Sequence, residues 1–238
     1  MSSTNSALWS VTALGDCALQ VRAERGISQV ISERIHRLAR QIRDLGFPEM
    51  LAAVPAFDTL TLRFVAGCDL LAARSRIVEL CSNFPSHAPV LSTPASCVEV
   101  LVGAEFGPDL AALATQLSCS PEAALMGFCS REYLVAQIGF QPGFPYLLGL
   151  PDAFAMPRRS EPRASVRPGS IAIGGAQAGI YPGASPGGWN VIAYTKQILF
   201  DPNAEAPCLF TAGNRVRFVW LQGLQREVLQ ARRDAYAV

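Results

Sequence analysis

Residues 139–151 read Gly139-Phe140-Gln141-Pro142-Gly143-Phe144-Pro145-Tyr146-Leu147-Leu148-Gly149-Leu150-Pro151. This stretch opens a window, residues 139–188, that holds 10 Gly and 8 Pro, half of the 36 such residues in the 238-residue chain. Proline lacks an amide donor and glycine forms helices poorly, so no long helix is expected there. The window is also dense in aromatic residues, which are normally buried at such density. It therefore predicts an ordered, loop-rich region of a globular domain.

The stretch itself has two interpretations. Prolines on either side of Gly143 fix the backbone and hold Phe144 and Tyr146 in place. The result is either a structural loop that plugs the end of a barrel or a rigid aromatic wall for a small ligand.

A second motif, residues 157–163, is rich in arginine and proline and reads Pro-Arg-Arg-Ser-Glu-Pro-Arg. Arg158, Arg159, Arg163 and the nearby Arg167 are opposed only by Glu161. Guanidinium groups offer a planar two-pronged donor, so the motif suits a carboxylate or a phosphate. The alternative is an exposed loop with internal ion pairs.

Two glycine-rich motifs complete the window, residues 174–182 (Gly-Gly-Ala-Gln-Ala-Gly-Ile-Tyr-Pro) and 185–189 (Ser-Pro-Gly-Gly-Trp). The glycines before Gln177 could present successive backbone amides to an anion, although no P-loop signature follows. Ser185 lacks the G-x-S-x-G frame of a nucleophile elbow. The two glycines before Trp189 indicate close packing against a large ring, and Tyr181 adds a further aromatic residue.

Composition excludes several classes of function. The net charge of +1, from 20 basic and 19 acidic residues, argues against nucleic acid and anionic membranes as partners. No apolar run reaches membrane-spanning length, and the N-terminus lacks a signal-peptide pattern. His36 and His87 both lie outside the window, which argues against a zinc site or a histidine-containing triad there. Seven cysteines without a C-x-x-C pair predict buried free thiols and a cytoplasmic protein.

Apolar periodicity predicts two domains. Residues 1–84 read β-β-α-β-β-α, an α+β unit whose first helix spans residues 27–45, with Ser28 as its cap and Gly46 as its stop. A proline-punctuated stretch over residues 84–94 then places the boundary, giving domains of residues 1–90 and 91–238. In the second domain Gly107-Pro108-Asp109 opens a helix to about Leu117, with Pro108 in its first turn, and Ser120 caps a second helix. Strands are predicted at 97–102, 133–138, 170–174, 190–196 and 215–221. So few helices predict a closed or barrel-like β domain.

The four motifs, together with Leu199-Phe200-Asp201-Pro202, occur in the same order and spacing as in the allophanate hydrolase subunit 1 family. The chain resembles this family from Leu14 to Phe218. The family includes the B-type subunit of bacterial ATP-dependent 5-oxoprolinase and a related sporulation-kinase inhibitor. The resemblance implies a carboxyltransferase domain of the C–D type, with a small N-terminal α/β sandwich followed by a cyclophilin-like β-barrel.

The resemblance also implies a function. The chain would be a cytoplasmic subunit of an ATP-dependent amide hydrolase, most simply 5-oxoprolinase, which converts 5-oxoproline to glutamate. It would act with a second cyclophilin-like subunit and, in 5-oxoprolinase, a third subunit. ATP with magnesium is expected at the level of the complex, with no metal site and no identified catalytic residue on this chain. A small anionic amide substrate would contact Gln141, Phe144, Tyr146, Arg158, Arg159, Arg163, Gln177, Tyr181, Ser185 and Trp189.

Departures from the family pattern keep an alternative open. Phe128, Ala178, Tyr194 and Asn214 stand where the family commonly has His, Thr, Arg and Asp. Losing the His, the Arg and the Asp removes polar groups capable of proton transfer or anion binding. Lys196, the only lysine, is a candidate replacement for the missing cation. The alternative is a non-catalytic regulatory protein such as a histidine-kinase inhibitor, whereas prolyl isomerase activity rests on fold analogy alone.

Overall fold

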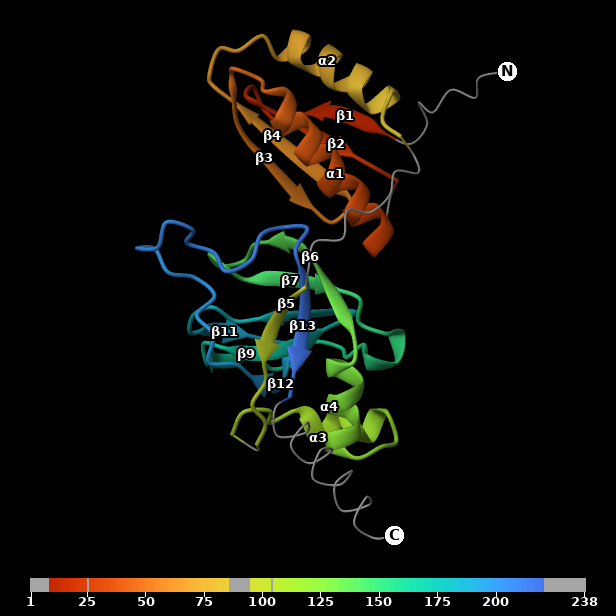
Figure 1. Cartoon of the computed structure of the whole chain (residues 1–238), viewed down its shortest axis with the longest axis vertical. Coiled ribbons are helices and arrows are strands. Elements are labelled where there is room, and N and C mark those ends of the chain that lie inside the picture. The colour runs from red at the N-terminus through yellow and green to blue at the C-terminus, as the bar shows by residue number, and fades with distance from the viewer. Residues whose placement is uncertain (1–8, 25, 86–94, 104, 221–238) are drawn as a thin grey trace, which may run out of the picture. The chain divides into compact units, whose positions relative to one another are not determined.

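The computed structural model describes residues 9–24, 26–85, 95–103 and 105–220. The chain divides into two compact units, Met1–Ser92 and Thr93–Val238 (Figure 1). The predicted domain boundary at residue 90 lies outside the described residues. Within the described ranges, no helix is both long and apolar enough to cross a membrane.

The first unit is a four-stranded antiparallel sheet in the order β1-β2-β4-β3, packed against two helices. Its elements are β1 (Ser10–Ala13), β2 (Ala18–Arg22), α1 (Gln29–Leu45), β3 (Met50–Ala56), β4 (Thr59–Phe64) and α2 (Leu70–Ser82). Leu19, Leu60 and Leu62 are fully buried on one sheet face, where they join a single core with Ile35 of α1 and Ile77 of α2. The predicted β-β-α-β-β-α order is confirmed.

The ends of α1 lie where the sequence predicted them. The Ser28 hydroxyl accepts a hydrogen bond from the amide of Ile31 at 3.2 Å, which satisfies one unpaired donor of the first turn. At the other end Gly46 has φ +59°, a left-handed conformation in which glycine carries no side-chain penalty.

The second unit is built on a seven-stranded sheet in the order β12-β9-β10-β7-β6-β13-β5. Its strands are β5 (Ser96–Glu99), β6 (Glu132–Ile138), β7 (Pro145–Leu148), β9 (Ser170–Gly174), β10 (Gln177–Ile180), β12 (Asn190–Tyr194) and β13 (Arg215–Val219). Just beyond β5, Leu101 exchanges two backbone hydrogen bonds, of 2.7 and 3.0 Å, with Tyr194 of β12. Because β5 and β12 are the two edges of the sheet, this bridge joins them. The α+β class and the barrel-like second unit are confirmed.

Further elements accompany this sheet. The helices α3 (Leu110–Gln116) and α4 (Pro121–Cys129) contact each other, and α4 contacts β13. A separate two-stranded ribbon pairs β8 (Arg163–Val166) with β11 (Ser185–Gly187), and a short 3-10 helix, η2, covers Asp152–Phe154. Ser120 caps α4 through its hydroxyl, as predicted. Pro108 precedes α3 instead of opening it, and the Asp109 side chain makes no cap hydrogen bond.

The structure corrects three further expectations. The window predicted to be loop-rich contains four strands the sequence did not reveal, β7, β8, β10 and β11. The Gly174–Gly175 pair is part of the tight β9–β10 hairpin, where the Gly175 amide donates to the Met156 carbonyl at 2.7 Å, so this amide is not free for an anion. The cysteines are free thiols, but Cys97 and Cys119 are exposed, not buried.

Successive side chains of the central strands point to opposite faces of the sheet, and they contribute to two different buried layers of the second unit. In β9, Ile171 and Ile173 belong to the core cluster shared by the barrel strands and by both helices. Ala172, between them, belongs to a second cluster on the opposite face of the strand. That cluster contains Phe144, Tyr181 and Trp189, with Tyr146 packed against it, and we call these four residues the aromatic layer.

Candidate functional site

The aromatic layer brings residues of three motifs into contact. The Phe144 ring lies at its centre. The distances from its centroid to the ring centroids of Tyr146, Tyr181 and Trp189 are 5.0, 5.2 and 5.6 Å. Most of these pairs meet edge to face, the geometry that ring quadrupoles favour. The structure thus gathers four of the predicted site residues on one face of the barrel.

Glycines make this packing possible. A Cβ atom on Gly174 would overlap the Trp189 ring, and one on Gly179 would overlap the Phe144 ring. Both rings therefore lie directly on the bare backbone of β9 and β10. The prediction that the glycines before Trp189 allow close packing against a large ring is confirmed at Gly187, where a Cβ would overlap the Tyr181 side chain, whereas the Trp189 ring itself lies on Gly174.

The two tyrosines keep their phenolic protons at neutral pH. Burial raises the pKa of Tyr146, and the nearby Arg158 guanidinium opposes this shift. Burial also raises the pKa of Tyr181, although its phenolic oxygen accepts a hydrogen bond from the Trp189 backbone amide, which opposes this shift. Protonated phenols can donate hydrogen bonds, so this face offers donors beside apolar rings.

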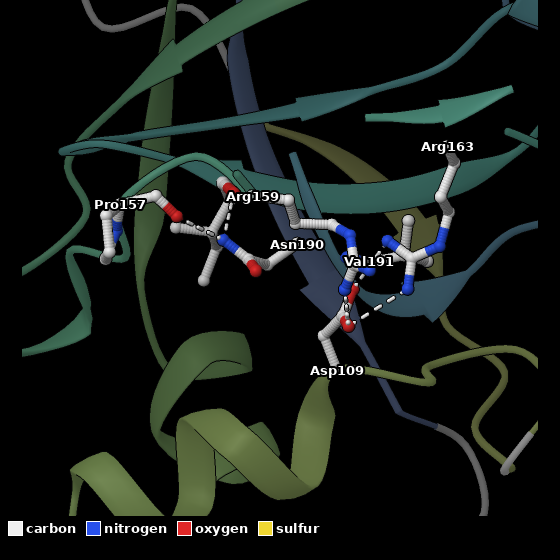
Figure 2. A network of polar contacts seen from close by, with 7 residues as sticks. Asp109, Pro157, Arg159, Arg163, Asn190 and Val191 are labelled. Carbon is white, nitrogen blue, oxygen red and sulfur yellow. Dashed lines mark hydrogen bonds and ion pairs between the residues drawn. The ribbon is translucent and has the colours of Figure 1, made fainter. Parts of the chain in front are cut away.

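Arg159 and Arg163 are held by a buried acid (Figure 2). Asp109 is 7% exposed, and its Oδ1 accepts from Arg159 at 3.2 Å and from Arg163 at 3.0 Å. Its Oδ2 lies 2.9 Å from the other terminal nitrogen of Arg163 and accepts from the Val191 amide at 2.7 Å. This corrects the expectation that both guanidinium groups are free for a ligand, because the alternative of internal ion pairs describes them better.

The loop that carries these arginines is fixed to β12 and to the fourth motif. The Asn190 side-chain amide donates to the Pro157 carbonyl at 2.8 Å (Figure 2). The Arg159 amide donates to the Gly188 carbonyl, also at 2.8 Å. Arg158 lies between these anchors with its guanidinium carbon 5.9 Å from the Trp189 ring centroid. Among the residues that the structure describes, no acidic side chain forms an ion pair with Arg158, which leaves it as the exposed cation beside the layer.

Gln141 and Ser185 lie on segments that border the layer. Each has a buried side-chain oxygen, Oε1 and Oγ respectively, without a hydrogen-bond partner in the described part of the chain. Gln177 begins β10 opposite Gly174 and is half-buried, so its side chain is on the face of the strand pair that the Trp189 ring covers. The structure therefore places Gln177, like Gln141 and Ser185, beside the aromatic layer.

Sequence reasoning missed Asp109 and Asn190. The excess of arginine in the second motif signals that a balancing acid is needed, but Asp109 lies 50 residues before Arg159. Nothing local in the sequence identifies it, and its position before a helix resembles an ordinary cap. Asn190 directly follows Trp189 and carries no recognisable pattern of its own.

The four positions that depart from the family pattern have structural contacts here. Phe128 is fully buried, with its ring 4.9 Å from Phe218, and Ala178 is fully buried in the barrel core. Tyr194 stacks on the Phe106 ring at 5.1 Å. The Asn214 side chain accepts from the Thr211 amide at 2.7 Å. Lys196, the proposed replacement cation, is exposed.

Comparison with known proteins agrees with the sequence motifs. The family model for the carboxyltransferase domain, subdomain C and D, matches residues 9–210. The chain is 36% identical over 208 residues to the B-type subunit of 5-oxoprolinase from Escherichia coli O157:H7, and the match covers 87% of this chain and 93% of that protein. It is 33% identical over 226 residues to the B-type subunit of 5-oxoprolinase from Bacillus subtilis (strain 168), covering 89% and 92%.

A solved structure shows the same likeness. The crystal structure of TTHA0988 in space group P212121 matches with a TM-score of 0.74 and 32% identity over 85% of this chain. This chain spans 40% of the length of that one. The resemblance to the family that includes the B-type subunit of 5-oxoprolinase is therefore confirmed, and the chain belongs to the family of carboxyltransferase domains, subdomain C and D.

Proposed function

We propose that this chain is a B-type subunit of an ATP-dependent 5-oxoprolinase. In that reaction water adds to the ring carbonyl of 5-oxoproline, the ring C–N bond breaks to give glutamate, and ATP is hydrolysed to ADP and phosphate. Two relatives that bear the subunit name align with this chain over more than nine-tenths of their lengths, which supports the proposal. Its partners would be a second cyclophilin-like subunit and a third subunit.

The observation that carries the proposal is Arg158 beside the aromatic layer. The substrate 5-oxoproline is a small ring that bears one carboxylate. A guanidinium group binds a carboxylate through two parallel charge-assisted hydrogen bonds, and aromatic rings provide an apolar surface for the ring atoms. The phenols of Tyr146 and Tyr181, protonated at neutral pH, add hydrogen-bond donors. In this proposal the chain binds and orients the lactam.

In the described part of the chain, neither an acidic cluster nor the glycine hairpin identifies a magnesium–ATP site. No group of three or more His, Cys, Asp or Glu side chains in the described part of the chain is placed to hold a metal ion. The glycine hairpin that could have held phosphate uses its Gly175 amide internally. We therefore derive no step of ATP cleavage on this chain and propose that ATP with magnesium acts at the level of the complex.

Reconstitution tests the proposal. The chain is mixed with its second and third subunits, and 5-oxoproline-dependent release of glutamate and ADP is measured. Arg158→Ala should raise KM for 5-oxoproline about 10- to 100-fold, because a hydrogen bond to a charged group contributes about 1.5–3 kcal/mol. The matched control is Arg167→Ala, shortly after the same motif. Arg167 lies over the Tyr194 ring, 4.4 Å from its centroid, so this substitution should leave KM near the wild-type value.

An inactive wild-type complex would contradict the proposal. The alternative is then tested by pull-down from the native cell. Recovery of a histidine kinase without companion hydrolase subunits would support a regulatory role.

A further inference from the structure

The turn between β6 and β7 holds Phe140 in a strained conformation. Phe140 has φ +65°, and the Gln141 amide donates to the Gly139 carbonyl across it at 2.8 Å. This is a γ-turn with positive φ at its central residue, which is rare and strained for a bulky side chain. Phe140 is 61% exposed, yet its ring meets Phe144 and Tyr181 edge-on at 5.5 and 6.3 Å. Backbone strain is found mainly at functional sites, so the strained turn beside the aromatic layer indicates a functional segment.

One unsatisfied polar atom, Gln141 Oε1, lies in this turn, and a second, Ser185 Oγ, lies on a neighbouring segment. Ser185 is 8% exposed and pairs across β8–β11 with Val166, a member of the cluster that contains the aromatic layer. Because directly opposed residues share a face of a strand pair, the Ser185 hydroxyl is on the side of this cluster. Gln141 Oε1 lies 3.9 Å from the position that a Cβ on Gly183 would take, two residues before Ser185.

The lack of partners for these atoms points to a ligand. Gln141 Oε1 and Ser185 Oγ are both covered, and neither has a hydrogen-bond partner among the described residues. Burying a polar group without a partner is unfavourable, so the pair is suited to a group that supplies a donor to one atom and an acceptor to the other. The amide side chain of glutamine can accept and a serine hydroxyl can donate.

We propose that Gln141 and Ser185 form the subsite for a cis amide, with Gln141 Oε1 accepting from the ligand N–H and Ser185 Oγ donating to the ligand C=O. This deepens the proposed function and rests on it, because a lactam presents its N–H and C=O side by side. Since both atoms are covered in the ligand-free chain, the β6–β7 turn opens to admit the ligand. The strain at Phe140 lowers the cost of that movement.

The experiment uses the full chain without partners or ATP and compares two neutral probes by NMR titration. The first is 2-pyrrolidinone, a lactam without a carboxylate, and the second is γ-butyrolactone, which keeps the ring and the C=O but lacks the N–H. The wild-type chain should bind the lactam about tenfold or more tightly than the lactone, because a site built to hydrogen-bond an N–H rejects an analogue without it.

Variants assign the two contacts. Gln141→Met should abolish the preference for lactam over lactone. Ser185→Ala should weaken both probes, because the C=O contact is common to them. The matched control is Ser165→Ala on β8, whose side chain is exposed and which should change neither affinity. Melting temperatures show whether all three variants are folded. The comparison of the two probes on the wild-type chain does not depend on the variants.

The outcomes separate this inference from the proposed function. Equal wild-type affinity for both probes, or a preference that survives Gln141→Met, overturns the inference and means that water satisfies the buried atoms. Lactam-selective binding by a chain whose reconstituted complex forms no glutamate supports the subsite and contradicts the 5-oxoprolinase assignment. Glutamate formation with an unchanged KM in Ser185→Ala supports the assignment and overturns the subsite.

Discussion

Single glycines decide whether the aromatic layer can pack on the barrel. Gly174 leaves the backbone of β9 bare beneath Trp189, and any side chain there would occupy the space of the ring. We expect Gly174→Ala to destabilise the chain by about 1–3 kcal/mol, because overpacking forces rings and backbone apart. Urea unfolding measures this loss as a lower midpoint. Displacing Trp189 should also weaken 5-oxoproline binding through Arg158, which lies over that ring.

The matched control is Gly188→Ala in the fourth motif. An added Cβ at Gly188 would meet its nearest atom, Cγ of Pro162, at 3.7 Å, an ordinary contact. Its φ is not in the left-handed region, so alanine should be neutral or stabilise by up to about 1 kcal/mol through the unfolded chain. Equal losses from both substitutions would show that glycine is needed in this window for backbone conformation instead of ring packing.

At this scale the sequence predicted the aromatic residues better than the charged ones. Phe144, Tyr146, Tyr181 and Trp189 are distinctive for their density among glycines, and their convergence follows from the need to bury large rings. The sequence could not predict that Arg159 and Arg163 pair with an acid while Arg158 stays exposed. This difference depends on a single carboxylate, Asp109, that only the folded chain brings close.

At the scale of elements, Asp109 connects α3 with β8 and β12. It stands at the start of α3, accepts from the Val191 amide of β12 and holds Arg163 of β8 and Arg159 of the preceding loop. We expect Asp109→Asn to lower the free energy of unfolding by about 3 kcal/mol, because removing one partner of a buried ion pair leaves uncompensated charge. Chemical denaturation monitors the loss. Because the same loop carries Arg158, KM for 5-oxoproline should rise more than kcat falls.

The control for this substitution is Glu161→Gln, which removes one negative charge from the loop that carries Arg158. Glu161 is exposed, and no ion pair joins it to a described residue, so stability should change by less than about 0.5 kcal/mol. The contrary result would be that Asp109→Asn changes the unfolding free energy as little as Glu161→Gln does. The ion pairs of Asp109 would then contribute little to stability, and the position of Arg158 would have to depend on Asn190 and the backbone contacts of Arg159.

At the scale of elements, the sequence predicted the first unit and both helices of the second, because apolar periodicity and caps are strong there. Ser28 and Ser120 both accept the amides expected of them. It missed β7, β8, β10 and β11 for a physical reason. In β10 the face toward the aromatic layer carries Gly179 instead of a large side chain, and β11 contains Pro186 and Gly187, so neither strand shows apolar alternation. The glycines that let the aromatic rings pack against these strands therefore also remove the apolar alternation by which the strands could be recognised.

The described residues of the first unit share one hydrophobic core, whereas those of the second form a barrel core and the cluster that contains the aromatic layer. Leu62 is fully buried in the core of the first unit, whereas Ile173 is fully buried in the barrel core of the second. Every residue of the proposed lactam site, from Gln141 to Trp189, belongs to the second unit. Stability and binding can therefore be perturbed separately.

We expect Leu62→Ala to lower the unfolding free energy of the first unit by about 2–5 kcal/mol, through lost burial and the cavity it leaves. Lactam binding should stay unchanged at temperatures below the first unfolding transition. Ile173→Ala, of similar cost, should instead weaken binding, because Ile173 pairs with Ala178 next to the strand positions beneath Trp189 and Phe144. Scanning calorimetry combined with 2-pyrrolidinone titration measures both effects. Loss of lactam binding in folded Leu62→Ala would show that the site depends on the first unit, and the two cores would then have to be treated as one functional body.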